Sequence, residues 1–360
     1  MYVPRHLRAD ALWKNMKTGK KETHLLLTGG GSLGSFQAGQ LVSLLLGAKA
    51  TSLLTPERAK AYLSGEDEAL DILKAMPKAW FKIASISGVS AGACNLAILG
   101  SSLAKGQEKV NRLDAAAHLI LFWLHDVPSM PSQLFHGRFH AMSKMPTSMR
   151  GWLDYMDLFT KAVPAEINPI IQAVEKHANF DLIRASDLPL YVAVTDISAD
   201  QPVILTNQNL EARMIAASGA IDEWGMQPVE GLGEGAYHHN PFMHFLADEE
   251  ERSDEDPDCV LMLRLDHNLV GSKSRSQEAR QAASMVKTFH APIKRDIERI
   301  RRKNKKEGRV IRLFESGLKR SYRFKPEDKA NTDQAFLVQA FVSGLQEGLE
   351  LLAGGFKKRI

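Results

Sequence analysis

A serine between two glycines is the residue whose setting most directly predicts chemistry. Gly88-Val-Ser90-Ala-Gly92 is a G-x-S-x-G pentapeptide, with a short strand-like run before it and small, helix-compatible residues after it. A sharp strand-to-helix turn of this kind exposes a serine hydroxyl at its apex, where it can act as a nucleophile. Gly88 and Gly92 form the expected elbow, because a side chain at either position would collide with the adjoining strand or helix.

A second glycine-rich turn lies near the start of the chain. Residues 23–28 are typical of a buried strand, and residues 35–46 of a helix, on either side of the run Gly-Gly-Gly-Ser-Leu-Gly. Its glycine spacing matches the dinucleotide-binding fingerprint, which needs a second strand with an acidic end ~20 residues later. No strand is indicated before Phe81. The pattern therefore favours an oxyanion hole, formed by Gly29, Gly30, Gly31, Ser32 and Gly34.

The remaining segments alternate between helix and strand. Residues 107–180 are predicted to be largely helical, and residues 188–196 and 202–206 to form a β-hairpin. Three further helices are predicted at 211–217, 276–307 and 333–352. One further strand is predicted at 259–265. No internal repeat and no Gly/Ser-rich linker divides the chain.

Composition places the chain among soluble globular proteins. Of its 360 residues, 44% are hydrophobic and 24% are charged. The net charge of +4 is too small to indicate a nucleic-acid partner. Cys94 and Cys259 lie in separate apolar runs, which favours buried, reduced thiols over a disulfide or a zinc site. The first residues contain no apolar signal region, and no run reaches the ~18 apolar residues of a membrane span, so a cytoplasmic protein is expected.

Two patterns in the helical stretch have simple structural explanations. An apolar helix face, at the spacing i, i+3, i+4 and i+7, is formed by Trp152, Tyr155, Met156 and Phe159. Core packing is favoured for this face over an acyl-chain groove or lid. His136 and His140 have i, i+4 spacing but lack the glutamate of an H-E-x-x-H motif, so no metal site is expected.

A basic segment runs from Lys294 to Arg309, with nine Lys or Arg residues against three Asp or Glu. Ile293, Ile297 and Ile300 share one face of the helix predicted there. Such a helix can lie on an anionic membrane, although a solvated face packed through its isoleucines is the commoner outcome. Aromatic residues are not interleaved with the charges, which argues against nucleic-acid binding.

Three blocks of this chain resemble, in order and spacing, the signature motifs of patatin-like phospholipases. They are the glycine run 29–34, the pentapeptide 88–92, and Glu234-Gly-Ala followed by Asn240-Pro241. Weaker similarity extends from about residue 22 to about residue 245. The resemblance implies an α/β fold with three layers, α/β/α, around a mostly parallel central sheet, and with a helical insertion at about 107–180. Residues 1–22 then form a lead-in, 23–270 an acyl-hydrolase domain, and 271–360 a helical region packed on that domain.

The resemblance also implies that the chain hydrolyses ester bonds of lipids with a serine–aspartate dyad and without a metal or other cofactor. Ser90 is then the nucleophile, and Glu234 stands where the family has aspartate. Serine needs a base within ~3 Å, and we expect Glu234 to serve as that base once burial raises its pKa. Its extra methylene requires the side chain to fold back or its loop to retreat. Leu33 also departs from the family, whose glycine run often has a basic residue there.

Several alternatives remain open from the sequence. His238 or His239 could act as the base in a triad-like site, although both are more simply explained as turn residues. Glu234, taken alone, is typical of a surface turn between two glycines. Because glutamate replaces aspartate, a catalytically silent or attenuated patatin-fold protein that binds lipid or a protein partner is the rival hypothesis. The partners expected are a lipid or ester substrate and, peripherally, an anionic membrane through residues 294–309.

Overall fold

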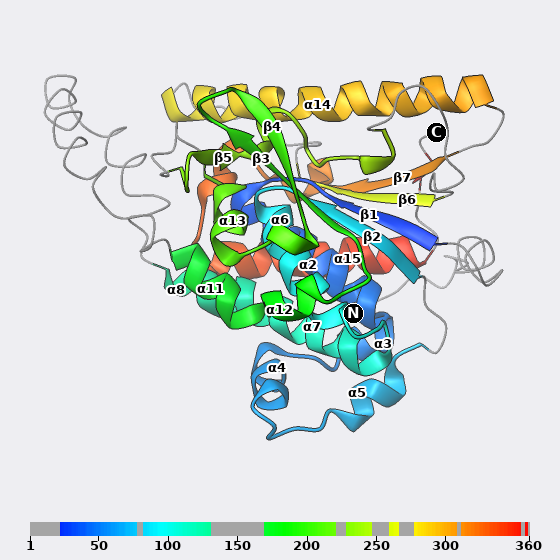
Figure 1. The fold of residues 1–360 in the computed structure, drawn as a ribbon. Coiled ribbons are helices and arrows are strands. Elements are labelled where there is room, and N and C mark those ends of the chain that lie inside the picture. Colours follow the sequence, from blue (N-terminus) through cyan, green and yellow to red (C-terminus); the bar gives the residue numbers. More distant parts are fainter. Residues whose placement is uncertain are drawn as a thin grey trace, which may run out of the picture.

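A mostly parallel sheet forms the centre of the fold (Figure 1). The computed structural model describes residues 22–77, 82–130, 169–220, 228–246, 259–265, 277–307, 311–353 and 357–358. The strands lie in the order β4-β3-β2-β1-β6-β7-β8, and β5 pairs with β3. Their bounds are β1 Glu22–Leu27, β2 Lys82–Gly88, β3 Leu190–Asp196, β4 Gln201–Thr206, β5 Leu232–Glu234, β6 Cys259–Arg264, β7 Arg312–Gly317 and β8 Lys357–Lys358. Strands β3, β2, β1, β6 and β7 are parallel, whereas β4, β5 and β8 pair antiparallel.

Helices cover both faces of this sheet, which gives the three-layer α/β/α fold that was predicted. Figure 1 shows α14 (Gln277–Glu307) along one face, and α2 (Gly34–Leu46), α6 (Ala91–Leu103), α7 (Lys109–Leu121) and α15 (Gln334–Leu352) on the other. Successive side chains of a strand point to opposite faces of the sheet, which allows a layer of helices to pack on each face. In β1, Leu25 and Leu27 pack toward the helices below, whereas Leu26 belongs to the cluster with the isoleucines of α14.

Two β-α units built from local signals place the site. β1 leads through a short 3₁₀ turn, Gly31–Leu33, into α2, and β2 leads directly into α6. Leu27 and Gly88 are partners in the parallel ladder, so both strands end at the same edge of the sheet. The glycine run and the Ser90 turn therefore lie side by side at the carboxyl ends of the strands, where open α/β sheets bind ligands.

Helices α2 and α15 pack against each other through small residues. A Cβ atom added to Gly344 would lie 1.9 Å from the carbonyl oxygen of Phe36, and one added to Gly39 would lie 2.1 Å from that of Phe341. Backbones can approach this closely only where no side chain intervenes. The carboxyl-terminal helix is thus fixed against the helix that follows the glycine run.

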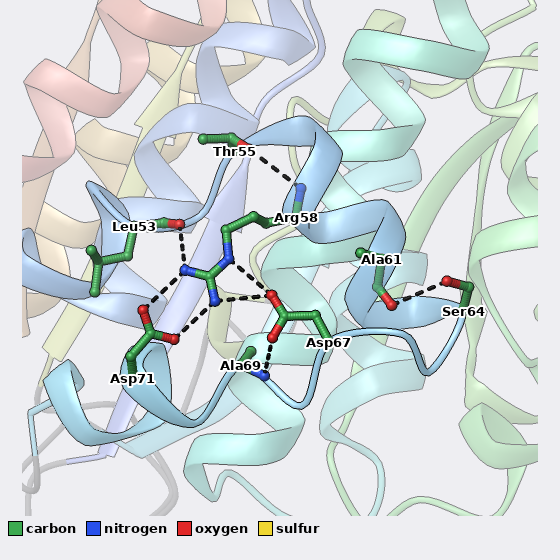
Figure 2. A network of polar contacts seen from close by, with 8 residues as sticks. All are labelled: Leu53, Thr55, Arg58, Ala61, Ser64, Asp67, Ala69 and Asp71. Carbon is green, nitrogen blue, oxygen red and sulfur yellow. Dashed lines mark hydrogen bonds and ion pairs between the residues drawn. The ribbon is translucent and has the colours of Figure 1, made fainter.

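A small helical segment, which lies between α2 and β2 in the sequence, projects from the lower layer (Figure 1). It contains α3 (Ala48–Thr51), α4 (Pro56–Leu63) and α5 (Leu70–Ala75). Figure 2 shows that Arg58 ties it together, because its guanidinium bonds Asp67 at 2.9 Å, both oxygens of Asp71 at 2.8 and 3.0 Å, and the Leu53 carbonyl oxygen at 3.2 Å. These bonds lower the pKa of Asp71 to about 2.

The described parts of the predicted helical stretch are helices. They comprise α7, a π-helical turn over Phe122–Asp126, α8 (Val127–Ser129), α11 (Pro169–His177) and α12 (Phe180–Arg184). The apolar stripe at Trp152, Tyr155, Met156 and Phe159 lies outside the described residues, as do His136, His140 and the lead-in up to residue 21. The hairpin at β3 and β4 and the helix α13 (Ala212–Ala217) form where they were predicted.

Strands β5 and β7 were not predicted. β5 has three residues, too few to show a period, and β7 has the mixed sequence Arg-Leu-Phe-Glu-Ser-Gly near one edge of the sheet. Because β7 extends the sheet next to β6, the region after residue 271 contributes a strand as well as helices.

Candidate active site

The turn at Ser90 has a strained backbone. Ser90 follows β2, precedes α6 and has φ +55° and ψ −125°, a conformation that costs a non-glycine residue about 1–3 kcal/mol. Its N–H donates to Ser218 Oγ at 2.9 Å, and the Ser218 hydroxyl in turn donates to the Ala193 carbonyl oxygen at 2.7 Å. The helix α13 and strand β3 therefore hold the turn in place through one serine.

The two glycines of the pentapeptide are required by space. A Cβ atom on Gly92 would lie 2.2 Å from the carbonyl oxygen of Leu27, and one on Gly88 would lie 2.6 Å from that of Gly92. Both contacts are with backbone atoms, which cannot move aside as a flexible side chain can. The chain can reverse from β2 into α6 only with glycine at these positions.

The glycine run packs directly against the Ser90 turn. A Cβ atom on Gly29 would lie 3.0 Å from Ser90 Cβ, and Gly31 has φ +55°. The Gly29 N–H donates to Asn240 Oδ1 at 2.8 Å, and the Gly34 N–H bonds carbonyl groups of the same turn. Within the described part of the chain, the N–H groups of Gly30, Gly31 and Ser32 have no hydrogen-bond acceptor.

Glu234 is buried at the end of β5. It is 1% exposed, and it pairs with Val194 where β5 runs antiparallel to β3. The interpretation as a surface turn residue was therefore wrong. Its Oε1 accepts a hydrogen bond from the Ala236 N–H at 2.9 Å, so the longer side chain folds back onto its own loop.

Ser90, Glu234 and the glycine run line one cavity. It contains about 220 Å³ of empty space, including solvent at its mouth, and is bordered by Gly29, Gly30, Gly31, Ser90, Glu234, Ala236, Phe289 and Lys329. The hydroxyl of Ser90 forms no hydrogen bond with any residue that the structure describes. The candidate nucleophile and the carboxylate therefore share a cavity without a direct bond between them.

A larger, apolar pocket also borders Ser90. It contains about 620 Å³ of empty space, solvent at its mouth included, and its walls are mostly apolar, among them Phe122, Trp123, Val127, Met130, Ile170 and Ile215. These residues come from the π-helical turn after α7, from α8, α11 and α13. A pocket of this size and lining suits a hydrocarbon chain held next to Ser90.

The two histidines after Glu234 line neither of these two cavities. His238 Nε2 is 3.3 Å from Asp200 Oδ1. His239 packs its ring edge-on against Phe242, and burial together with nearby Arg295 lowers its pKa to about 4. Neither histidine is among the described residues that line the space around Ser90.

Three residues near the site were not assigned a role from the sequence. Asn240 was part of the resemblance, but its bond to Gly29 spans 211 residues and has no local signal. Ser218 stands at the end of a small-residue helix and has no motif of its own that indicates its bond to Ser90. Lys329 lies in the 3₁₀ segment Pro326–Ala330, and nothing in the neighbouring sequence marks it as buried.

Other predictions concern metals, thiols and membranes. Cys94 and Cys259 are both buried, as predicted, neither forms a disulfide within the described residues, and burial raises the pKa of Cys94 to about 12. Among the described residues, no group of three His, Cys, Asp or Glu side chains is placed to hold a metal ion. None of the described helices combines the length and apolarity needed to cross a bilayer.

Comparison with known proteins finds structural matches, one of which is a distant similarity to a bacterial protein. No family model and no curated protein matches the chain. The chain is similar to the crystal structure of VipD from Legionella pneumophila, with a TM-score of 0.31 and 14% sequence identity, over 94% of this chain and 68% of VipD. No function follows from a similarity of this degree.

Proposed function

We propose that this chain is a serine acyl hydrolase that cleaves carboxylic ester bonds of lipids. One observation carries the proposal: Ser90, on a strained strand-to-helix turn, shares a cavity with a buried carboxylate and with a turn that presents N–H groups. The resemblance of the three motifs to those of patatin-like phospholipases supports the same reaction. The apolar pocket beside Ser90 supports a substrate with an acyl chain.

In the first step, Ser90 Oγ attacks the carbonyl carbon of the ester while Glu234 accepts the hydroxyl proton. The N–H groups of Gly30, Gly31 and Ser32 would bind the oxyanion, because those of Gly29 and Gly34 are already bonded. One such donor typically contributes about 3 kcal/mol of transition-state stabilisation. Glu234 then gives its proton to the departing alcohol oxygen as the C–O bond breaks, which leaves the acyl group on Ser90.

In the second step, Glu234 takes a proton from a water molecule as that water attacks the acyl-enzyme. The Ser90 oxygen leaves with the proton, and the carboxylic acid is released. The absence of a Ser90–Glu234 hydrogen bond is compatible with this role, since catalytic hydrogen bonds often shorten only when substrate is bound.

The proposal is tested by hydrolysis of a p-nitrophenyl ester series. We expect Ser90→Ala and Glu234→Gln to fall to background and Glu234→Asp to keep activity. Ser52→Ala and Glu211→Gln change the same residue types at exposed positions and serve as matched controls. If Glu234→Gln hydrolyses as fast as the wild type while Ser90→Ala is inactive, Glu234 is not the base.

A second candidate is a catalytically silent protein that binds lipid or a protein partner through the same pocket. The observation in its favour is that Glu234 bonds Ala236 and not Ser90. A fluorophosphonate probe separates the two candidates, because it labels an activated serine. Labelling of the folded wild type that disappears in Ser90→Ala supports the hydrolase, and no labelling of either protein supports the silent binder.

We also propose peripheral contact between α14 and anionic membranes. Ile293, Ile297 and Ile300 pack in the core, so contact would be electrostatic and would come from exposed side chains such as Lys294 and Lys305. We expect co-sedimentation with phosphatidylserine vesicles at low salt, its loss at high salt, and its weakening in Lys294→Glu/Lys305→Glu. Vesicle binding that is weakened neither by high salt nor by Lys294→Glu/Lys305→Glu would contradict this proposal.

A further inference from the structure

Trp123 has the largest side chain among the described residues that line the apolar pocket beside Ser90. It lies on the π-helical turn Phe122–Asp126 and is 4% exposed. Turns of this kind are rare and occur frequently at functional sites. The position of this one indole ring therefore has a large effect on the space that remains for a ligand.

The indole ring lies close to the residue that follows the candidate nucleophile. A Cβ atom added to Gly34 would lie 2.4 Å from Trp123 Cζ2 and 2.8 Å from Ala91 Cβ. The ring and Ala91 are therefore neighbours, and the glycine leaves room for both. Because Ala91 comes directly after Ser90 and both line the pocket, the ring forms part of the wall near the nucleophile.

A chain of buried amides holds the indole in this orientation. Its Nε1–H donates to Asn95 Oδ1 at 2.7 Å, and Asn95 Nδ2 donates to Gln37 Oε1 at 3.0 Å and to the Gly34 carbonyl oxygen at 3.2 Å. Gln37 Nε2 donates in turn to the carbonyl oxygen of Leu263, on strand β6, at 2.9 Å. Asn95 and Gln37 are both fully buried. These hydrogen bonds thus connect the pocket wall to the central sheet.

The same bonds keep the indole from moving aside for a larger ligand. Rotating the ring would leave its N–H and the Asn95 oxygen unpaired in a buried place, which is unfavourable. Phe122 packs edge-on against the ring, with the two centroids 5.2 Å apart and an interplanar angle of 83°, and restricts it further. Met130 lines the same pocket, but its flexible side chain can adapt to a ligand. Trp123 is therefore a large part of the wall with a fixed shape.

We propose that Trp123 sets the upper size of the acyl group that the pocket accepts, and that Asn95 is a positioning residue that acts by holding the indole. This inference rests on the proposed acyl hydrolase function. An acyl group on Ser90 extends into the pocket that Ser90 and Trp123 both line, so a group too large for the space beside the ring is excluded. A residue that only stabilised the fold would have no effect on this selectivity.

The kinetic test compares p-nitrophenyl octanoate with p-nitrophenyl hexadecanoate, which differ only in the length of the acyl chain. We expect Trp123→Ala to raise the ratio of kcat/KM for the long ester to that for the short ester by about 10-fold or more, since even one methylene changes the fit to a hydrophobic pocket by this factor. Trp123→Phe keeps a smaller ring, should raise the ratio less, and is the second variant should Trp123→Ala fail to fold. Phe180→Ala is the matched control, because Phe180 packs on the same core and lines neither cavity, and it should leave the ratio as in the wild type.

Asn95→Leu tests the positioning role. It removes the acceptor of the indole N–H and leaves Trp123 itself unchanged, so the ring can move aside for a longer chain. We expect the ratio to rise by less than in Trp123→Ala, and to rise no further when Asn95→Leu is added to Trp123→Ala, because the two residues act as one unit. If Asn95→Leu lowers the stability, or both rates equally, and leaves the ratio unchanged, Asn95 has a structural role alone.

Two kinetic outcomes would overturn the inference about Trp123. An unchanged ratio in both Trp123→Ala and Trp123→Phe would show that the ring does not limit the acyl group. An equal loss of rate with both esters would show that the ring supports the Ser90 turn instead.

A binding measurement separates this inference from the proposed function. Calorimetry on Ser90→Ala uses octanoic acid and hexadecanoic acid as probes and requires no turnover. We expect Trp123→Ala, introduced into Ser90→Ala, to raise the affinity for hexadecanoic acid relative to that for octanoic acid by about 10-fold. If that shift occurs while no form of the protein hydrolyses an ester, the hydrolase is refuted and the role of Trp123 is kept. If the wild type hydrolyses esters and the relative affinity does not shift, Trp123 is not the size limit and the hydrolase is kept.

Discussion

Asn240 holds the glycine run in place, and its removal gives the sharpest test of how the site is supported. The side chain is fully buried, its Oδ1 accepts from the Gly29 N–H at 2.8 Å, and its Nδ2 donates to the Phe289 carbonyl oxygen at 3.0 Å. Asn240→Ala leaves one buried donor and one buried acceptor without these bonds. At about 1–3 kcal/mol for each, the free energy of unfolding should fall by about 2–5 kcal/mol.

The same change should lower the rate of ester hydrolysis. Gly29 lies against Ser90 Cβ, so a glycine run that shifts by about 1 Å moves the N–H groups that we propose as oxyanion donors, which is expected to lower kcat about 100-fold. Asn240→Asp keeps an acceptor for Gly29 but turns a carboxylate oxygen toward the Phe289 carbonyl. It should therefore lose stability while keeping more of the rate than Asn240→Ala.

Urea unfolding followed by tryptophan fluorescence gives the stability, and p-nitrophenyl butyrate hydrolysis gives the rate. Asn111→Ala is the control, because that amide donates to the Gly106 carbonyl oxygen at 3.0 Å on a half-buried part of α7 and lines neither cavity beside Ser90. If Asn240→Ala unfolds like the wild type, or loses stability with no change in rate, the amide does not position the glycine run.

Three further predictions concern stability. The pKa of His239 in the folded chain, about 4, is below its ordinary value of 6.5, so between these two pH values the unfolded chain carries a proton on His239 that the folded chain does not. The free energy of unfolding should therefore fall by up to about 3 kcal/mol as the pH drops from 6.5 to 4. The fall should be smaller in His239→Gln, which has no group that titrates at this position. Gly344→Ala should lower the free energy of unfolding by about 1–3 kcal/mol in urea titrations, because the added methyl group meets the Phe36 carbonyl oxygen. Helix propensity alone predicts the opposite, a gain of about 1 kcal/mol. Arg58→Met should raise the pKa of Asp71 from about 2 toward its ordinary 3.8 in an NMR titration and speed hydrogen exchange in residues 52–77; an unchanged Asp71 pKa would contradict the network of Figure 2.

The parts of the fold that could be predicted are those with local signals. The strand, glycine turn and helix over residues 23–46 combine a buried run, a glycine cluster and helix-compatible residues in one continuous stretch. The same holds for β2 and α6, where Gly88 and Gly92 mark the turn. Because each unit is contiguous in sequence, its periodicity and its glycines indicate the same structure.

The parts that could not be predicted depend on contacts between distant segments. β7 gains its place in the sheet by pairing with β6 across a long helix, and its own sequence shows no clean alternation. Lys329 is buried because the segment that carries it packs against Gly31, about 300 residues earlier in the chain. A lysine in a polar stretch indicates solvent exposure, so the charge beside Ser90 could be found only in the folded structure.

The geometry of Glu234 explains why glutamate and aspartate could both serve at this position. The Glu234 side chain curls against its own backbone, because Oε1 accepts a hydrogen bond from the N–H of Ala236, two residues later. This conformation takes up the extra methylene while β5 stays in register with β3. An aspartate side chain makes the same bond to the N–H two residues on as its preferred local geometry. Glu234→Asp should therefore keep the loop where it is and present a carboxylate to the same cavity. A Glu234→Asp protein that folds with wild-type stability but hydrolyses nothing would show that the reach of the carboxylate, and not its loop, limits the reaction.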